Sequence, residues 1–257
     1  MEQLQYQLKT IRLSAMASAL PVRLQEAKAN DLPHLEFLSL LVQDELEKRK
    51  ERLLNKRLKT ARFPELKTLD TFNFDFNPSI NKRLILELYA SGFIHKAENV
   101  LLLGPPGVGK THLAIAIGIG AIYNGYTVCY RSIFDLAEDM AEAYALGNRR
   151  EMVQRFVKSN LLIIDEFGMR KLPHQAAEDL LEIFHRRYHQ GATIIATNRP
   201  LADWGKILGD NVATSAILDR FMHNAHLITI KGRSYRLKSI TNLQKVQKDV
   251  DKKLKNS

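Results

Sequence analysis

The 257-residue sequence contains one cysteine, one tryptophan and no long apolar run. Because a single cysteine cannot pair within its own chain, an internal disulfide framework is excluded. No stretch reaches the about 18 apolar residues that a membrane-spanning helix needs. The start, MEQLQYQLKT, lacks the basic and then apolar order of a signal peptide. We therefore expect a cytoplasmic protein of one or two folded units that makes no contact with a membrane.

Charge is unevenly distributed along the chain, whose formal net charge is +10. Residues 1–65 carry 12 lysines and arginines against 9 acidic residues, and residues 66–230 carry 17 of each. Residues 231–257 carry 9 against 2. A neutral centre with basic ends is typical of a protein that binds a polyanion, but basic ends can also serve solubility alone. Charge by itself does not decide between polyanion binding and solubility.

Apolar spacing divides the chain into a helical front and a larger α/β region. Leu4, Leu8 and Ile11 recur at helical spacing, and a longer helical pattern ends at Pro64. From about residue 66, helical patterns alternate with five short apolar runs, at 99–103, 127–132, 160–166, 192–198 and 226–232. Because these runs are continuous, they predict an α/β fold with a parallel sheet that helices cover on both faces. The expected domains are 1–65, all-helical; 66–232, the α/β core; and 233–257, a basic tail.

The stretch GPPGVGKT, residues 104–111, fits the phosphate-binding pattern G-x-x-x-x-G-K-T, with a strand pattern before it and a helix pattern after it. Its glycines let backbone N–H groups point at phosphate oxygens, and the following helix adds its positive end. Lys110 can reach the β and γ phosphates, and the Thr111 hydroxyl can bind Mg²⁺. The residues expected to bind the nucleotide are Gly104, Pro105, Pro106, Gly107, Val108, Gly109, Lys110, Thr111 and His112.

Two adjacent carboxylates, Asp165 and Glu166, follow the apolar run LLII and so lie at the carboxyl end of a buried strand, where ligands bind in such sheets. Asp165 can hold the Mg²⁺ shell, and Glu166 can polarise a water for in-line attack on the γ-phosphate. A hydrolase must position that water, whereas a kinase must exclude it. The pair therefore favours ATP hydrolysis over transfer to a small acceptor.

Two later residues are candidates for the same reaction. Asn198 ends the run TIIAT and can orient the attacking water, although asparagine is also common in turns. Arg220, in SAILDRFMHNA, can stabilise the transferring phosphoryl group and can come from a neighbouring subunit. A surface arginine paired with Asp219 is the alternative, and sequence spacing leaves both open.

Four segments, GPPGVGKTHLA, LLIIDEFG, TIIATNRP and AILDRFMHNAHLITIKGRSYR, together resemble the AAA+ ATPases, in the clade of initiators and helicase loaders. Within that clade the sequence is most similar to the IstB-like transposition helper ATPases, over nearly its whole length. The resemblance implies an AAA+ P-loop fold with a small helical N-terminal domain. It assigns Lys110 and Thr111 to Walker A and Asp165 and Glu166 to Walker B. It further implies that Asn198 is sensor 1 and that Arg220 is an arginine finger acting in trans.

The same resemblance implies partners. ATP and Mg²⁺ would drive formation of homo-oligomers, ring-like or helical, on duplex DNA with little sequence preference, and the assembly would help a transposase to select and engage its target. The sequence departs from most AAA+ proteins at its end, because only about 27 residues follow the last strand. We therefore expect the helical lid to be reduced or absent, with Arg233 or Arg236 as the candidate sensor 2 residue.

Basic residues on helical faces are the candidates for phosphate contacts, since no zinc-finger pattern or aromatic platform for single strands is present. One row lies in the helical front and consists of Arg49, Arg52, Lys56 and Lys59, at steps of three, four and three. A second group, between the second and third strands, comprises Arg149, Arg150 and Arg155, which could add to a DNA-facing groove, although a solvated face is the favoured interpretation for any one of them. Such contacts would give affinity and salt dependence without base recognition.

Two other functions stay open. A replicative helicase loader of the DnaC type would use the same ATPase core, and its helical front would bind the helicase rather than DNA. A metabolic P-loop kinase would bind a small acceptor and would have no effect on DNA. The pair Asp165 and Glu166 and the absence of an obvious acceptor-binding insertion disfavour the kinase.

Overall fold

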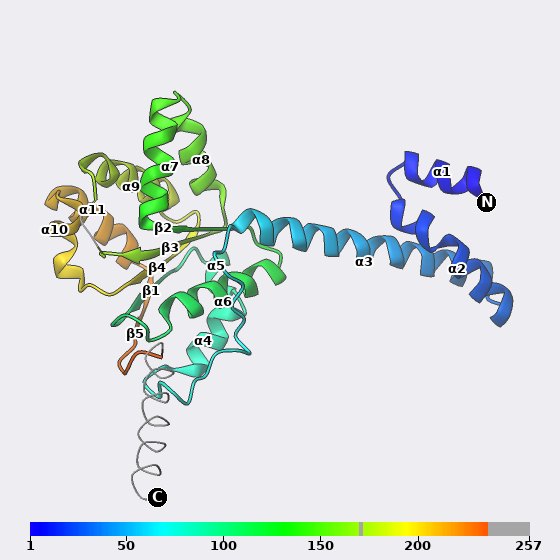
Figure 1. The fold of residues 1–257 in the computed structure, drawn as a ribbon, viewed down its shortest axis with the longest axis horizontal. Helices are drawn as coiled ribbons and strands as arrows, with labels where there is room; N and C mark the ends of the chain where they lie inside the picture. The colour runs from blue at the N-terminus through cyan, green and yellow to red at the C-terminus, as the bar shows by residue number, and fades with distance from the viewer. Residues whose placement is uncertain (170–171, 236–257) are drawn as a thin grey trace, which may run out of the picture. The chain divides into compact units, whose positions relative to one another are not determined.

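The computed structural model describes residues 1–169 and 172–235 (Figure 1). Contacts between residues divide the chain into two compact units, Met1–Arg57 and the part from Leu58 onward. This division falls within helix α3 (His34–Ala61), before the predicted domain boundary at residue 65. Most of the predicted basic tail, from residue 236, lies outside the described residues. No helix in the described part is both long and apolar enough to cross a bilayer.

The first unit consists of helices α1 (Glu2–Thr10), α2 (Ser14–Asn30) and the larger part of α3. Its small core is formed by Met16, Leu20 and Leu41. A buried carboxylate on α3, Glu45, accepts hydrogen bonds from the N–H groups of Ala15 and Met16, in the first turn of α2. Because those N–H groups have no partner within their own helix, Glu45 caps α2 from a distance in sequence.

The second unit is built on a five-stranded sheet, with strands β1 (Asn99–Leu103), β2 (Val128–Ser132), β3 (Leu161–Phe167), β4 (Ala192–Thr197) and β5 (Ala225–Thr229). The strand order is β2-β3-β4-β1-β5, and every neighbouring pair is parallel. This confirms the parallel five-stranded sheet predicted from the continuous apolar runs. All strand carboxyl ends therefore meet at one edge of the sheet, and all amino ends meet at the other.

Helices cover both faces of the sheet (Figure 1). On one face, α6 (Lys110–Tyr123) packs closely, since the side chain of Ile163 on β3 lies where a Cβ on Gly118 would have to be. Helices α4 (Lys82–Tyr89) and α5 (Gly92–His95) are on the same side. Leu162 and Ile164, the neighbours of Ile163, join the core of the opposite face. Side chains thus alternate between two buried faces, as a covered parallel sheet requires.

The opposite face carries α7 (Ile133–Ala145), α8 (Arg149–Lys158), α9 (His174–Arg187), α10 (Trp204–Leu208) and α11 (Asn211–Met222), with a 3₁₀ turn at Leu201–Asp203. The helical patterns identified in the sequence do not include α10, α4 or α5. These three helices are short, at 5, 8 and 4 residues, so they offer too few turns for apolar spacing to mark them.

Candidate functional site

The predicted phosphate loop lies between the end of β1 and the start of α6. Gly107 and Gly109 have φ angles of +79° and +104°, a region that side chains rarely adopt. Close neighbours also exclude side chains, because a Cβ on Gly109 would lie 2.6 Å from the ring of Phe72. A Cβ on Gly104 would collide with the carbonyl oxygen of Ile230. Backbone shape and packing therefore both require glycine in this loop.

Lys110 begins α6, and its ammonium group is held over the loop. The Nζ atom donates hydrogen bonds to the carbonyl oxygens of Gly104, at 2.8 Å, and Pro105, at 2.9 Å. These contacts keep the charge beside the backbone that the sequence predicts to surround phosphate.

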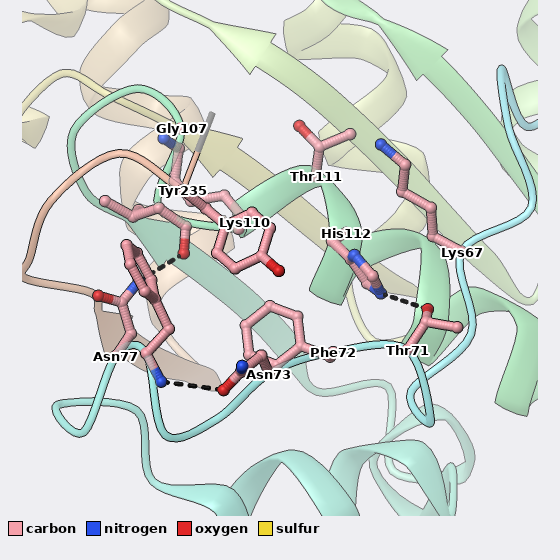
Figure 2. Close-up of a pocket in the computed structure, with 13 residues that line it drawn as sticks. Lys67, Thr71, Phe72, Asn73, Asn77, Gly107, Lys110, Thr111, His112 and Tyr235 are labelled. Atoms are coloured by element: carbon pink, nitrogen blue, oxygen red, sulfur yellow. Dashed lines mark hydrogen bonds between the residues drawn. The ribbon is translucent and has the colours of Figure 1, made fainter. Parts of the chain in front are cut away.

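A cavity of about 160 Å³ opens beside the loop (Figure 2). Three parts of the chain form its wall: the segment that precedes α4, the loop with the start of α6, and Tyr235, which follows β5. The lining residues are Lys67, Thr71, Phe72, Asn73, Phe76, Asn77, Gly107, Val108, Gly109, Lys110, Thr111, His112 and Tyr235. An aromatic wall with a few polar groups, next to a phosphate loop, can hold the base and ribose of a nucleotide.

Hydrogen bonds fasten the cavity wall to the phosphate loop. The Asn77 side chain donates to the carbonyl oxygen of Val108, and the N–H of Tyr235 donates to that of Gly107, both at 2.9 Å. The His112 Nε2 atom lies 2.8 Å from the carbonyl oxygen of Thr68 and therefore carries a proton. Of the nine predicted nucleotide-binding residues, Gly107 to His112 line the cavity, whereas Gly104, Pro105 and Pro106 do not.

Asp165 is buried near the carboxyl end of β3. Its Oδ2 atom accepts a hydrogen bond from the Tyr130 hydroxyl at 2.9 Å, and its Oδ1 atom accepts one from the N–H of Glu166 at 2.8 Å. Burial, and then the charge and hydrogen bond of Asp165, raise the pKa of Tyr130 well above its ordinary value. Tyr130 therefore stays protonated and fixes one carboxylate oxygen.

Glu166 is exposed, and its φ angle of +58° is rare for a residue with a side chain. The pairing of β3 with β4 shifts register between Ile164 and Phe167, so the bend is a bulge in the strand. As a result Asp165 and Phe167 stay buried while the side chain between them faces solvent. Strain of this kind is concentrated at functional sites.

Asn198 follows β4 and is joined to the loop by strand pairing, since Leu103 at the end of β1 pairs with Thr197. Its amide oxygen is buried and has no hydrogen-bond partner among the described residues. A buried acceptor without a partner is rare and calls for a ligand or a water. The loop, Asp165 and Asn198 therefore share the carboxyl edge of the sheet.

Arg220 lies at the other edge. It is in the last turn of α11, just before β5, and Ala225 at the start of β5 pairs with Asn99 at the start of β1. The phosphate loop follows Leu103, at the opposite end of β1, so the length of a strand separates the two. The Arg220 Nη1 atom donates to the carbonyl oxygen of Ala216 at 2.8 Å. No ion pair joins Arg220 to Asp219 in the described part of the chain.

The basic row on α3 divides into two kinds of residue. Arg49 donates to the Glu45 carboxylate and to the carbonyl oxygen of Arg12, and Arg52 donates to the Ser14 hydroxyl. These two arginines thus bind the turn between α1 and α2. Lys56 and Lys59 are exposed. Of the two candidate sensor 2 residues, Arg233 is exposed and Arg236 lies outside the described residues.

Sequence reasoning missed Tyr130, Phe72 and Tyr235 as parts of the site. Tyr130 belongs to the apolar run TVCYRS, in which nothing marks its hydroxyl as a partner of Asp165. The aromatic segment FNFDF, residues 72–76, is a usable signal, because aromatic side chains commonly line ligand pockets. Its contact with the loop depends on tertiary structure.

The comparisons with known proteins agree with this geometry. Residues 6–242 match the family described as IstB-like ATP binding protein. One relative, described as an ATP-binding protein of insertion sequence IS5376 from Geobacillus stearothermophilus, is 37% identical over 239 residues, which are 93% of this chain and 95% of the relative. A second relative is described as an ATP-binding protein of insertion sequence IS21 from Pseudomonas aeruginosa. It is 37% identical over 238 residues, which are 93% of this chain and 90% of the relative.

Solved structures show the same fold. The DnaC helicase loader superimposes with a TM-score of 0.53 at 27% identity, over 64% of this chain and 96% of the loader. DnaA from Aquifex aeolicus, bound to AMPPCP, gives 0.55 at 24% identity, over 72% of this chain and 56% of DnaA. The second unit therefore has the AAA+ P-loop fold.

Proposed function

Because the chain belongs to the family of IstB-like ATP binding proteins, we propose that it hydrolyses ATP and that ATP assembles its copies on duplex DNA. The observation that carries this proposal is the position of Arg220, at the edge of the sheet opposite the phosphate loop. An arginine there serves the phosphate of a neighbouring copy rather than that of its own chain. Turnover would then require assembly.

The residues at the carboxyl edge suit hydrolysis. Backbone N–H groups of the loop and the Lys110 ammonium bind the phosphates, and the cavity beside Phe72 takes the base. The exposed carboxylate of Glu166 accepts a proton from the attacking water, and the amide oxygen of Asn198, which has no partner among the described residues, accepts a hydrogen bond from that water. The Arg220 guanidinium of the next copy neutralises the charge that develops on the γ-phosphate.

The oxygen atoms of Thr111 and Asp165 fit Mg²⁺, a hard cation that prefers oxygen ligands. Asp165 is suited to this role because Tyr130 holds its carboxylate in one orientation. When bound, Mg²⁺ would neutralise phosphate charge. The chain's own residues supply the rest of the site.

The relatives are described as ATP-binding proteins of insertion sequences, which supports a transposase as the partner and transposition as the process. In this proposal the assembled copies hold target DNA with little sequence preference and help the transposase to engage it. Hydrolysis loosens the contacts between copies and releases the DNA. A helicase loader is the second candidate, supported by the similarity to the DnaC loader.

Sedimentation of the chain with ATP and a duplex tests the assembly. We expect large DNA-bound oligomers with ATP and small species with ADP, and Glu166→Gln should hold the large form because it binds ATP without cleaving it. Wild-type chain that stays small with ATP and duplex together would refute the proposal. Capture of purified transposase, compared with capture of a replicative helicase, separates the two candidate partners.

A further inference from the structure

The three arginines that the sequence groups together near α8 have different surroundings. Arg149 donates from Nη2 to the Asp179 carboxylate and from Nη1 to that of Glu182, both at 2.7 Å, so two acids on α9 neutralise it. Arg150 and Arg155 take part in no ion pair in the described part of the chain. Arg149 therefore joins two helices, whereas Arg150 is exposed and Arg155 is half-buried, and neither has an acidic partner in the described part of the chain.

Arg150 and Arg155 belong to a shallow groove on the outer face of α8. Val153 and Phe156 bury the inner face of this helix, and the groove is lined by Arg150, Glu151, Gln154, Arg155 and Lys158. Arg150, Gln154 and Lys158 follow one another at steps of four residues, so they lie on one face at intervals of about 6 Å. Lys158 also has no ion pair within the described residues.

A second hollow continues this groove toward α9. It shares Gln154 and Lys158 with the first, and its other lining residues are Val157, His185, Arg186 and Gln190. The surface formed by the two hollows is called the α8–α9 groove. Glu151 is the one carboxylate among its lining residues, and the nearby Glu182 is already bound by Arg149 and Arg186.

We propose that the α8–α9 groove binds the sugar-phosphate backbone of duplex DNA, an inference that rests on the proposed function. Cations without acidic partners keep their full attraction for phosphate, and the amides of Gln154 and Gln190 can donate to phosphate oxygens. His185 carries the one ring among its lining residues, which include no phenylalanine, tyrosine or tryptophan, so the groove offers no extended platform for stacking exposed bases. Contacts of this kind hold DNA with little dependence on sequence.

The contrast with α3 favours this surface over the row that the sequence analysis singled out. Arg49 and Arg52 already bind groups of their own unit, so DNA would have to displace Glu45, Arg12 and Ser14 from them. Arg150, Arg155 and Lys158 form no ion pair within the described residues, so DNA that binds them would displace water and counterions there. Release of those counterions is itself the main source of affinity for DNA.

The groove also adjoins the surface that carries Arg220. Gln190 lines the groove, while the preceding residues Tyr188 and His189 line a small depression together with Arg220. Copies joined through Arg220 would therefore each present the groove at a fixed distance from the contact between them. Once one copy is bound to DNA, the grooves of the joined copies would bind the same duplex at a high effective concentration, so the assembly would have a higher affinity than a single copy.

The test is the affinity for a labelled 30-base-pair duplex, measured by fluorescence anisotropy with ATP over a series of salt concentrations. The variant Arg150→Ala/Arg155→Ala/Lys158→Ala removes the three cations. The matched control, Arg83→Ala/Lys96→Ala/Lys206→Ala, removes the same charge from exposed positions elsewhere in the second unit. Both should bind ATP and unfold at the wild-type temperature.

We expect the groove variant to lose at least tenfold in DNA affinity, and the slope of log K against log salt to become shallower by up to about 2.7. The control should stay within about twofold of wild type, because distant charges are screened. A groove variant with wild-type affinity and slope, in an assay where wild type binds, would overturn the groove and leave the proposed function standing. Wild type that binds no duplex would overturn the proposed DNA function itself.

An acidic protein segment is the other polyanion that this surface could attract. Polyglutamate of matched charge serves as the probe for it. If the groove variant loses polyglutamate binding but keeps the wild-type affinity for duplex, the groove serves a protein partner and the proposal is wrong. If duplex affinity falls as expected and polyglutamate displaces DNA weakly, the proposal holds.

Discussion

The two edges of the β sheet differ in how their polar groups are satisfied. At the carboxyl edge, the Asn198 amide oxygen is buried without a partner in the described part of the chain, and Glu166 adopts a strained backbone conformation that exposes it. At the amino edge, Arg187 is fully buried and donates to the carbonyl oxygens of Phe156 and Ser159, at 2.7 Å each, and of Ala192. One edge is arranged for a ligand, and the other is closed by the chain itself.

Arg187 shows how the closed edge is held together. Burial lowers the pKa of Arg187 to about 10, so the group is still charged at neutral pH. Its neighbours there are carbonyl oxygens and the Thr193 hydroxyl, which Nε approaches at 3.1 Å. These contacts tie the end of α8 to the start of β4. The difference between the edges indicates that contacts within the chain hold the amino edge, which also carries Arg220, and we expect a bound nucleotide to satisfy the carboxyl edge.

The largest expected effect concerns the pair formed by Arg220, at the amino edge of one copy, and Glu166, at the carboxyl edge of its neighbour. Arg220→Ala should lower ATP turnover by about 10³-fold or more, because the arginine that neutralises the γ-phosphate is lost. The variant Glu166→Gln should hydrolyse ATP similarly slowly, although its Arg220 is intact. A 1:1 mixture should recover up to about a quarter of the wild-type rate, since one head-to-tail contact in four pairs an intact Glu166 with an intact Arg220.

Steady-state phosphate release from each variant and from the mixture checks this expectation. ATP binding, measured by a fluorescent analogue, should be retained by both variants and serves as the control for folding. Normal turnover of Arg220→Ala as a monomer would place the residue outside the reaction. A mixture as slow as its components would mean that both residues act within one chain.

The next effect concerns the closed edge alone. Arg187→Met should lower the free energy of unfolding by at least about 3 kcal/mol, because several buried carbonyl oxygens lose their donor and each costs about 1–3 kcal/mol. Urea unfolding followed by circular dichroism measures the change. Arg186→Met is the matched control, since Arg186 is partly exposed in a surface pair with Glu182 and should cost less than about 1 kcal/mol. If Arg187→Met and Arg186→Met lowered the free energy of unfolding equally, Arg187 would be no more important for stability than a surface arginine.

Sequence could predict the carboxyl edge because its determinants are local. The glycine loop is one continuous motif, and Asp165 and Asn198 directly follow apolar runs whose continuity marks buried parallel strands. Parallel strands bring these ends together without further information. The parallel fold, and the grouping of the loop, Asp165 and Asn198 at one edge, therefore follow from patterns that span fewer than ten residues each.

Sequence could not predict the amino edge, because its determinants are tertiary. Arg186 and Arg187 are adjacent and chemically identical, yet the partners of Arg187 include the backbone carbonyl groups of residues 156, 157, 159, 160 and 192, which no side-chain pattern reveals. Arg149 and Arg150 differ for a similar reason, since the acids that bind Arg149 come from α9. Charge counts along the chain treat all four as equal contributions to a basic surface.

A smaller effect tests how the carboxyl edge orients its carboxylate. Tyr130→Phe should slow turnover by about tenfold, the equivalent of losing one hydrogen bond of about 1.4 kcal/mol to a charged group. The concentration of Mg²⁺ at half-maximal rate should rise, while ATP affinity in the absence of metal should not change. Tyr123→Phe, which alters an exposed tyrosine, is the control. An unchanged Mg²⁺ dependence would show that the hydroxyl contributes only to packing.

The smallest effect concerns the cavity beside the phosphate loop. The Phe72 ring packs edge-on against Phe74 and His112, with centroids 4.8 and 5.1 Å away, and it also touches Gly109. Phe72→Leu keeps most of the apolar bulk but removes the flat surface, so ATP affinity should fall by about fivefold, close to 1 kcal/mol. The maximal rate at saturating ATP should stay near wild type, because neither Glu166 nor the Arg220 of the next copy is altered. A lower maximal rate with unchanged ATP affinity would mean that Phe72 holds the phosphate loop in place rather than binding the base. The cavity wall would then contribute to the hydrolysis step, in which Glu166 and the Arg220 of the next copy take part.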